Sequence, residues 1–218
     1  MVWTDEDSVR LLTGLETTDI SDADLTSLIG IAQKEVLLQI NNNIIREKIE
    51  YIDETRKNEI NGSNATFYVK NWEGKYISDY NYDLTINTSD VSVISVDSSG
   101  TETELTVSSI TYDDGKIILS SAPSDVDLYI TYAYSYFDPD TPNPILKLAV
   151  EYLAASYAYM RINSSQKKQV KFGNVSITNG TGEDSAYFFM YNKYMDIIRQ
   201  LNDNLIGGAI WGESLVKI

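Results

Sequence analysis

Closely spaced carboxylates are the residues of this sequence that could perform chemistry. Two carboxylates on either side of a glycosidic bond can act as acid and base or as acid and nucleophile. Each pair here lies beside Gly, Pro or Ser, in turn-like sequence where Asp bonds readily to nearby backbone. We interpret them as turn residues and expect no enzyme, with an enzyme built on Asp138 or Asp140 as an alternative. The pairs are Asp113/Asp114, Asp125/Asp127 and Asp138/Asp140.

The sequence lacks the residues that other kinds of reaction centre require. The chain has no His and no Cys, which removes the commonest general base, the commonest metal ligand and thiolate chemistry. No Gly-rich loop ends in Gly-Lys-Ser/Thr. None of the carboxylate pairs has the alternating oxygen ligands, central Gly and terminal Glu of a calcium loop. We therefore predict no catalytic residue, no cofactor and no metal.

The charge of the chain is strongly acidic. The net charge is −15, so the protein should repel phosphate backbones and anionic lipid. Residues 66–140 hold 13 acidic and three basic side chains. A salt-loving host is a rival explanation for this acidity. The one basic cluster, Lys167, Lys168 and Lys171, is typical of a solvated loop, or of one that meets passing phosphate.

The apolar residues do not indicate a membrane protein. No stretch approaches 18 uninterrupted apolar residues, and the chain starts with an acidic segment where a signal peptide would be basic and then apolar. We expect a soluble protein made in a cytoplasm.

The N-terminal part has helical periodicity. A short turn or helix spans Asp7 to Thr13 and is closed by Gly14, and Ser21 is the expected N-cap of the next helix. The mixed charges from Ile45 to Ile60 are typical of a solvated helix face. The apolar stripe of the second helix comprises Leu25, Leu28, Ile29, Ala32, Val36, Ile40 and Ile44.

After the breaker at residues 61–64 the apolar period changes to two. Short alternating segments separated by turn signals predict a small antiparallel sandwich or barrel, and Asp114-Gly115 predicts a hairpin turn. The predicted strands are Thr66–Lys70, Tyr82–Ile86, Val91–Val96, Thr103–Tyr112, Lys116–Leu119 and Leu128–Tyr136.

The C-terminal part is again helical. Asn143 and Pro144 open a helix to Ile162, with one face holding Ile145, Ala149, Tyr152, Leu153, Ser156 and Met160. Alanines 149, 154, 155 and 158 should let another helix approach closely. A hairpin follows at 169–178, then a helix at about 183–205 and, after Gly207-Gly208, an apolar tail that we expect to bind a partner.

These segments define the predicted fold class. It is α+β: a small helical bundle with an inserted antiparallel β-sandwich or barrel, a β-hairpin and a long C-terminal helix. The predicted parts are residues 1–63 (helical), 64–137 (inserted β domain), 138–206 (helical, with the hairpin) and 207–218 (extended tail).

Two sequence blocks resemble head-tail connector proteins of tailed viruses, the adaptor or head-completion family. The first is VRLLTGL at 9–15 with Asp19, Ile20, DLTSLIGIA at 24–32, Val36 and Ile40; the second is PNPILKLAVEYLAASYAYMR at 142–161. The chain departs from the short members of that family in its β insertion and its long last helix and tail.

The resemblance implies a ring, commonly of twelve identical subunits, at the virion neck after assembly in the host cytoplasm. Such a ring lies beneath the portal, continues the DNA channel without binding the genome specifically, and contacts a tail or neck protein. It implies portal contacts at Ile210, Trp211, Leu215 and Val216, and a channel-facing or tail-facing hairpin tip at Lys171, Phe172, Gly173 and Asn174.

The subunit interface is predicted from the residues themselves. A ring needs two different adhesive faces on each subunit. The last helix offers one, with Tyr187, Tyr191, Tyr194, Ile198 and Leu201 at coiled-coil-like spacing, and the Ala-rich helix offers another.

An alternative function is a virion-surface or glycan-binding module carried by the β insertion. Its stacking patch would comprise Trp72, Tyr76, Tyr80 and Tyr82. Ordinary sheet packing also explains these aromatic residues.

Overall fold

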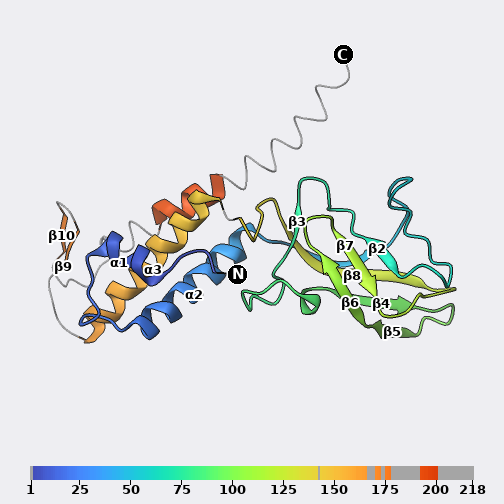
Figure 1. The fold of residues 1–218 in the computed structure, drawn as a ribbon, viewed down its shortest axis with the longest axis horizontal. Helices are drawn as coiled ribbons and strands as arrows, with labels where there is room; N and C mark the ends of the chain where they lie inside the picture. The colour runs from blue at the N-terminus through green and yellow to red at the C-terminus, as the bar shows by residue number, and fades with distance from the viewer. Residues whose placement is uncertain (1, 142, 166–169, 173–174, 178–191, 201–218) are drawn as a thin grey trace, which may run out of the picture. The chain divides into compact units, whose positions relative to one another are not determined.

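The computed structural model describes residues 2–141, 143–165, 170–172, 175–177 and 192–200 (Figure 1). The chain forms two compact units. The β unit comprises residues 40–141, and the helical unit comprises residues 2–39 with the described residues after 142. The protein is therefore mixed α+β, with a helical unit built from sequence-distant segments.

The first helix of the helical unit is α1, Glu6–Thr13. Asp5 is its N-cap and accepts a 2.8 Å hydrogen bond from the Ser8 N–H, which holds the pKa of the Asp5 carboxyl below its usual value. Gly14 ends the helix at φ 70°, and its N–H donates to the Arg10 carbonyl at 2.7 Å. The predicted short helix and its Gly stop are confirmed.

Helix α2, Asp22–Ile40, starts as predicted. The Ser21 hydroxyl accepts a 3.2 Å hydrogen bond from the Asp24 N–H, which satisfies one free donor of the first turn. The predicted stripe is buried in the core from Leu25 to Ile40, but its last predicted member, Ile44, lies beyond the end of the helix and is only partly buried. Gln33 is also buried, and its side-chain oxygen accepts from the Trp3 N–H at 3.1 Å.

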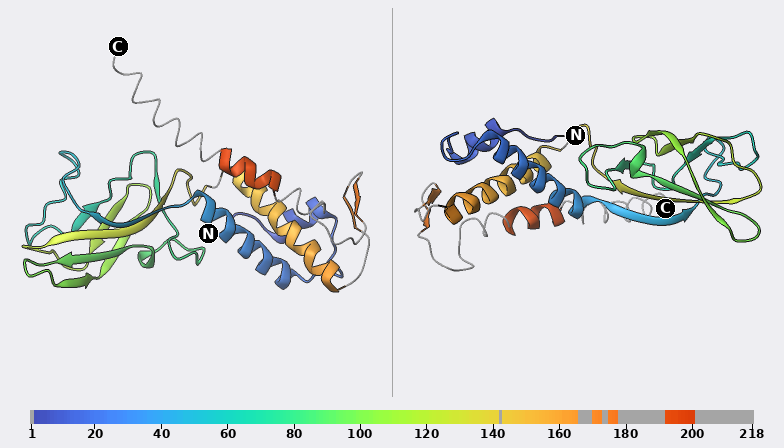
Figure 2. Two further views of the ribbon diagram at one scale, coloured as in Figure 1. Left: turned by 180° about the vertical axis from the view of Figure 1, so that it is seen from behind. Right: turned by 90° about the horizontal axis from the view of Figure 1, so that it is seen from below.

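Helix α3, Pro144–Ser165, begins at the predicted cap, where the Asn143 side chain accepts from the Ile145 N–H at 2.9 Å. The four alanines are buried, and the helical residues 192–200 lie beside α3 (Figures 1 and 2). The Tyr152 ring stacks on the Tyr194 ring of that segment, with 4.0 Å between ring centroids. Ile145 and Met160, predicted on one face together with Ala149 and Leu153, are exposed, whereas Ala149 and Leu153 are buried.

The prediction of a helix face from Ile45 to Ile60 is wrong. Residues Asn42–Lys48 form strand β1, and residues 49–60 contain no helix. β1 pairs antiparallel with β8, with a register irregularity between Ile44 and Glu47 where Arg46 has φ 58°. Cross-strand pairing overrode the charge pattern, because i,i+4 ion pairs contribute only a few tenths of a kcal/mol each.

The β unit contains two antiparallel sheets. One has the order β1-β8-β4-β5, with β3 also paired to β8; the other has the order β2-β7-β6. Their strands are β2 Thr66–Tyr68, β3 Tyr76–Ser78, β4 Ser92–Val96, β5 Glu102–Leu105, β6 Val107–Thr111, β7 Lys116–Leu119 and β8 Asp127–Ser135.

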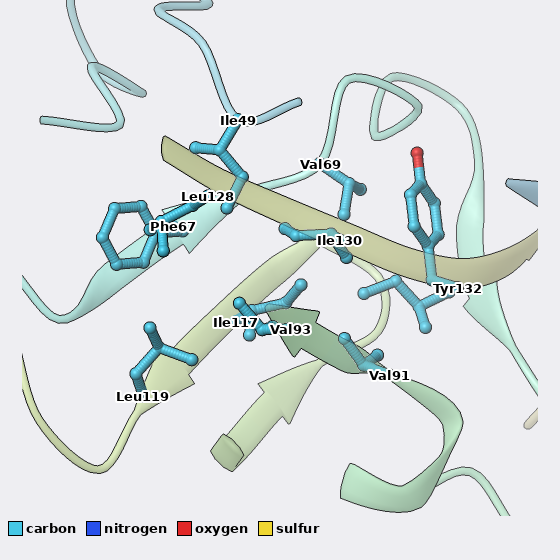
Figure 3. Close-up of a cluster of buried hydrophobic side chains, with 11 residues drawn as sticks. Ile49, Phe67, Val69, Val91, Val93, Ile117, Leu119, Leu128, Ile130 and Tyr132 are labelled. Atoms are coloured by element: carbon cyan, nitrogen blue, oxygen red, sulfur yellow. The ribbon is translucent and has the colours of Figure 1, made fainter. Parts of the chain in front are cut away.

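One cluster of buried side chains holds the two sheets together (Figure 3). Phe67 and Ile117 come from the smaller sheet, while Val93, Ile130 and Tyr132 come from the larger, and all five are at most 1% exposed. This is a sandwich core, as predicted, and the barrel alternative is wrong because the sheets do not close on each other.

Several strand predictions are confirmed and others are corrected. β2, β4, β7 and β8 lie where predicted, and the predicted hairpin turn is present, with Thr111 paired to Lys116 and Gly115 at φ 60°. The predicted strand Thr103–Tyr112 is two strands, β5 and β6, in different sheets. Residues 82–86 form no strand, since Tyr82 and Leu84 have positive φ.

The boundaries of the β unit differ from the predicted domain of residues 64–137. The compact unit extends from residue 40 to 141 because β1 lies in the larger sheet and Tyr112 binds the Asp140 carboxylate at 2.6 Å. That hydrogen bond raises the pKa of the Tyr112 hydroxyl above its usual value. The predicted hairpin is confirmed in its strands, β9 Val170–Phe172 and β10 Val175–Ile177.

Two glycines with positive φ give a matched test of this packing. A Cβ on Gly115 would lie 2.7 Å from the Trp72 Cβ and 2.9 Å from a Val69 methyl, whereas a Cβ on Gly100 would meet nothing within 4 Å. Gly100→Ala should cost about 1–2 kcal/mol of left-handed strain. Gly115→Ala should cost about 1–3 kcal/mol more because of the clash. Urea unfolding followed by circular dichroism measures both, and equal losses would contradict the packing.

Candidate functional site

The helical unit joins the two sequence blocks at 9–40 and 142–161. The Tyr159 hydroxyl donates to the Thr13 carbonyl at 2.6 Å, and the Arg161 guanidinium binds the Asp24 carboxylate at 2.7 Å. The Thr4 hydroxyl donates to Glu151 at 2.8 Å. Residues separated by more than 130 positions in the sequence are thus joined by hydrogen bonds and an ion pair between α3 and residues 4–24.

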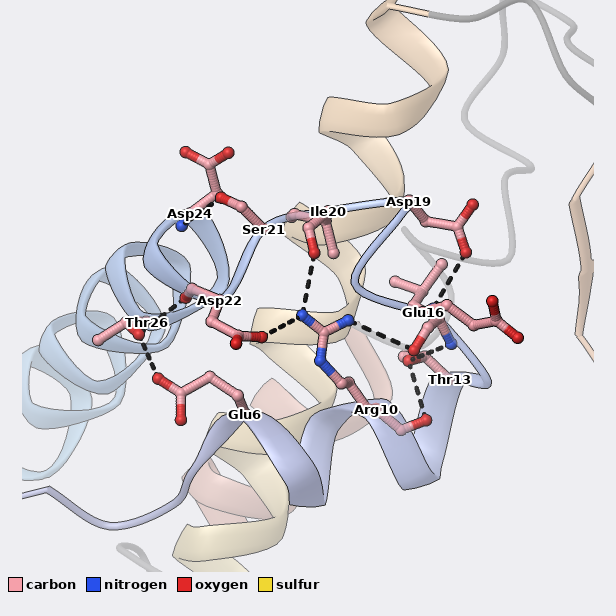
Figure 4. A network of polar contacts seen from close by, with 11 residues as sticks. Glu6, Arg10, Thr13, Glu16, Asp19, Ile20, Ser21, Asp22, Asp24 and Thr26 are labelled. Carbon is pink, nitrogen blue, oxygen red and sulfur yellow. Dashed lines mark hydrogen bonds and ion pairs between the residues drawn. The ribbon is translucent and has the colours of Figure 1, made fainter.

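Arg10 fixes the loop between α1 and α2 (Figure 4). Its guanidinium donates to the Ile20 carbonyl at 2.9 Å, to the Asp22 carboxylate at 2.6 Å and to the Leu15 carbonyl at 3.4 Å. Only 13% of the Arg10 side chain is exposed. A partly buried guanidinium that binds two carbonyls and a carboxylate determines the course of this loop.

Local capping completes the network in Figure 4. Thr13 donates to the Val9 carbonyl at 2.7 Å, Asp19 accepts from the Glu16 N–H at 3.0 Å, and the Thr26 hydroxyl donates to Glu6. Each of these bonds stays within or between α1, its following loop and α2. The polar groups of this network form hydrogen bonds with one another, so the network holds α1, the loop and the start of α2 in place.

A shallow cavity of about 230 Å³ lies where this loop meets α3. Its charged lining consists of Asp19, Asp24 and Arg161, and Arg161 already binds Asp24. Asp19 accepts a backbone N–H. The charged side chains of this lining are thus engaged with each other or with backbone.

Each of the three carboxylate pairs that opened the sequence argument has a member with a partner in the β unit. Asp138 accepts from the Asp140 N–H at 2.9 Å, and Asp114 binds Arg56 at 2.9 Å. Asp127 binds Lys48 at 2.9 Å. The Asp138 contact is the local backbone bond expected of a turn residue, whereas Asp114 and Asp127 form ion pairs with residues distant in the sequence.

Most of the predicted site residues lie outside the described residues. These are Ile210, Trp211, Leu215 and Val216 of the tail, Gly173 and Asn174 of the hairpin tip, and Tyr187, Tyr191 and Leu201 of the last helix. Lys171 and Phe172 lie on β9, where Phe172 pairs with Val175. Tyr194 and Ile198 pack inside their own helical unit, at 9% and 1% exposure, which leaves little of either for a second subunit.

The described part of the helical unit does expose apolar side chains. Ile31 and Leu38, seven residues apart on α2, are 47% and 55% exposed. Ala23 and Ser27 continue the same exposed row toward the start of α2. We call these four residues the α2 row.

The β unit contains two buried carboxylates that the sequence reasoning missed. Asp79 follows β3, and its carboxylate accepts from the Asp83 and Leu84 N–H groups at 3.1 and 2.7 Å. Asp90 accepts from the N–H groups of Tyr80, Asn81 and Asn87 at 2.8, 3.3 and 2.8 Å. Both side chains are fully buried, and burial is the main reason that the pKa of Asp90 is raised.

The regular spacing of oxygen-bearing residues in the sequence could have indicated these two carboxylates. Oxygen-bearing residues recur at alternate positions from Asp79, whereas the sequence argument considered only close pairs. As placed, no group of three or more His, Cys, Asp or Glu side chains in the described part of the chain is arranged to hold a metal ion. Nor is any described helix long and apolar enough to cross a bilayer.

The aromatic residues of the predicted glycan patch are half-buried. The Arg56 guanidinium lies 3.5 Å from the centroid of the Trp72 ring, and the Tyr76 ring lies 6.3 Å from Tyr112. A cation over the face of Trp72 occupies the position a sugar ring would need. This contact favours packing over glycan binding for Trp72.

Comparison with models of known protein families and with curated proteins found no match. The resemblance of the two blocks therefore stays a prediction.

The Arg10 contacts predict a measurable effect on stability. Arg10→Met keeps most of the side-chain volume but leaves the Ile20 carbonyl without its donor, and should cost about 2–3 kcal/mol of unfolding free energy. The matched control is Arg199→Met, because Arg199 is 62% exposed and its ion pair among the described residues is with Asp196, also exposed, at 3.3 Å. The control should cost less than about 0.5 kcal/mol. Urea unfolding measures the loss of unfolding free energy in both variants, and equal losses would contradict the role of Arg10.

Proposed function

We propose that this protein is a structural head-tail adaptor of a tailed virus. Copies of the chain form a ring beneath the portal, continue the DNA channel and link the capsid to the tail. One observation carries the proposal: the two blocks that resemble connectors, far apart in the sequence, pack into one unit. The β unit is inserted between them without interrupting either block.

The charge of the chain supports passage of DNA. Each subunit carries a net charge of −15, and a ring multiplies that charge around the channel. A wall that repels phosphates does not retain the genome as it moves. Specific binding of DNA has no part in this proposal.

Exposed apolar residues supply candidate contacts between subunits. The α2 row presents Ile31 and Leu38 on a regular helix face, which a second copy can cover with a different face in a head-to-tail ring. Because Tyr194 and Ile198 pack internally, the α2 row takes the place of the last helix as the proposed interface. The tail residues Ile210, Trp211, Leu215 and Val216 remain the proposed portal contacts.

The test is assembly of the purified chain with the portal of the same virus. Native mass spectrometry and negative-stain microscopy should detect a closed ring on the portal and locate the chain at the virion neck. Trp211→Ala should reduce portal binding at least about tenfold, the effect of losing a central aromatic anchor. A chain that stays monomeric with its portal and is absent from the neck would refute the proposal.

A matched pair of variants tests the α2 row. Ile31→Glu with Leu38→Glu should abolish ring formation, because each introduced charge would be buried without a partner. Ile45→Glu with Tyr51→Glu makes the same charge change at exposed apolar residues of the β unit, at 72% and 58% exposure, and should leave assembly intact. If both double variants assemble, the α2 row is not the interface.

A further inference from the structure

We propose that the outward side of α1 covers the α2 row of the neighbouring copy in the ring. We call this surface the α1 face, and it consists of Asp7 and Leu11. The inference rests on the proposed function, because it names the second of the two adhesive faces that a head-to-tail ring requires. The first face is the α2 row, with its exposed residues Ile31 and Leu38.

The first observation is the exposure of Leu11. This side chain is 90% exposed, more than any other large apolar side chain of the described residues. Asp7 is exposed one helical turn earlier, and both residues lie on the side of α1 opposite Val9, which is buried. A single exposed Leu is ordinary on a protein surface, so the charges beside it decide what it can contact.

The second observation is that α1 and α2 each hold one charged side chain without a partner. Asp7 of α1 and Lys34 of α2 are exposed and form no hydrogen bond or ion pair with the described residues. These two charges have opposite sign and can therefore bind each other between copies. The remaining charged side chains of both helices bind within the helical unit: Glu6 with Thr26, Arg10 with Asp22, Asp24 with Arg161, and Glu35 with Tyr157.

Lys34 lies within the α2 row. It comes three residues after Ile31 and four residues before Leu38, so the three side chains share one exposed side of α2. The row is thus an apolar strip with a cation between its two apolar members. The α1 face is its counterpart, an apolar side chain with an anion one turn away. The two faces are therefore complementary in charge, and both offer apolar contact.

The spacing along the two helices also matches. Asp7 and Leu11 are four residues apart, about 6 Å along the helix axis. Lys34 is separated from Leu38 by the same distance, and from Ile31 by about 4.5 Å in the other direction. When Asp7 binds Lys34 of the neighbouring copy, Leu11 therefore meets Leu38 if the helices run parallel and Ile31 if they run antiparallel. Both directions place Leu11 on the α2 row.

The net charge of −15 disfavours most other contacts between copies. A complementary pair of charges offsets this repulsion locally and fixes the register of the contact. Ile145 and Leu148 on α3 are also exposed and form a rival face, but the nearby Lys147 binds Glu151 at 4.0 Å. That face has no free carboxylate to offer Lys34, whereas the α1 face has one.

The experiment uses introduced cysteines, because the natural chain contains none. The full chain carrying Leu11→Cys with either Leu38→Cys or Ile31→Cys is incubated with the portal of the same virus, which gathers the subunits, and is then oxidised. One of the two pairs should give a ladder of covalent oligomers on a non-reducing gel, since each copy links to two neighbours. The matched control is Leu11→Cys with Ile45→Cys, whose second position is 72% exposed in the β unit, and it should give no ladder.

The outcomes separate this inference from the adaptor proposal. If the natural chain forms a ring on the portal but neither cysteine pair gives a ladder, the inference is overturned and the adaptor proposal stands. If the natural chain stays monomeric with its portal, both are refuted. An equal ladder from the control pair would overturn the inference, because it would indicate random collision. Efficient dimers from Leu11→Cys alone would also overturn it, because they would show α1 packing on itself.

An exchange of charges tests the ion pair without cysteine chemistry. Lys34→Glu and Asp7→Lys should each reduce ring formation on the portal at least about tenfold, because each places like charges opposite one another. The variant with both changes restores opposite charges and should assemble again, whereas Lys193→Glu, at an exposed lysine of the helical residues 192–200, should have little effect. Circular dichroism checks that each variant is folded. A folded double variant that does not assemble would overturn the inference.

Discussion

Pairing of β1 with β8 is the constraint on which the rest of the β unit depends. β1 begins directly after α2, and β8 ends shortly before α3, so their pairing places Asn42 opposite Tyr134. The strands that enter and leave the insertion are therefore neighbours. A domain whose ends are adjacent can be inserted in a helical unit without separating the flanking segments. The same β8 also pairs with β3 and β4 on its other edge, which makes it the centre of the larger sheet.

The helices could be predicted from sequence because periodicity and capping agreed with each other. Ser21 and Asn143 are caps, and the buried residues of α2 follow the predicted stripe. β1 and β3 could not be predicted in the same way. β1 carries charged residues on its exposed positions, and β3 is only three residues long, so both depend on pairing with β8 for their conformation. Cross-strand partners are tertiary information, which a local pattern does not contain.

The candidate functional residues, too, could be predicted from the sequence only in part. Exposed Ile31 and Leu38 were not predicted as a surface, because the helical pattern alone does not say which apolar residues a neighbouring helix covers. Tyr194 was predicted at a subunit interface and packs on Tyr152 instead. An apolar seam in a sequence indicates that a face is buried, and only the fold decides whether its partner lies in the same chain or in another copy.

The acidic side chains of the β unit belong to two physically different groups, which the net charge does not distinguish. Surface carboxylates such as Asp127 and Glu102 lie in water and bind exposed bases, Lys48 and Arg46, so they cost little and stabilise little. Asp79 and Asp90 are different, because their charges are removed from water and lie near each other.

Backbone N–H groups offset part of the cost of burying these charges, yet the raised pKa of Asp90 means that its ionised form is less favourable in the folded state than in the unfolded chain. The sign follows: this group opposes folding increasingly as the pH rises through its ordinary pKa toward the raised one, and the full penalty remains at neutral pH. The five backbone N–H groups from which these two carboxylates accept hydrogen bonds, and the buried apolar cluster of the same unit, offset this penalty in the folded state.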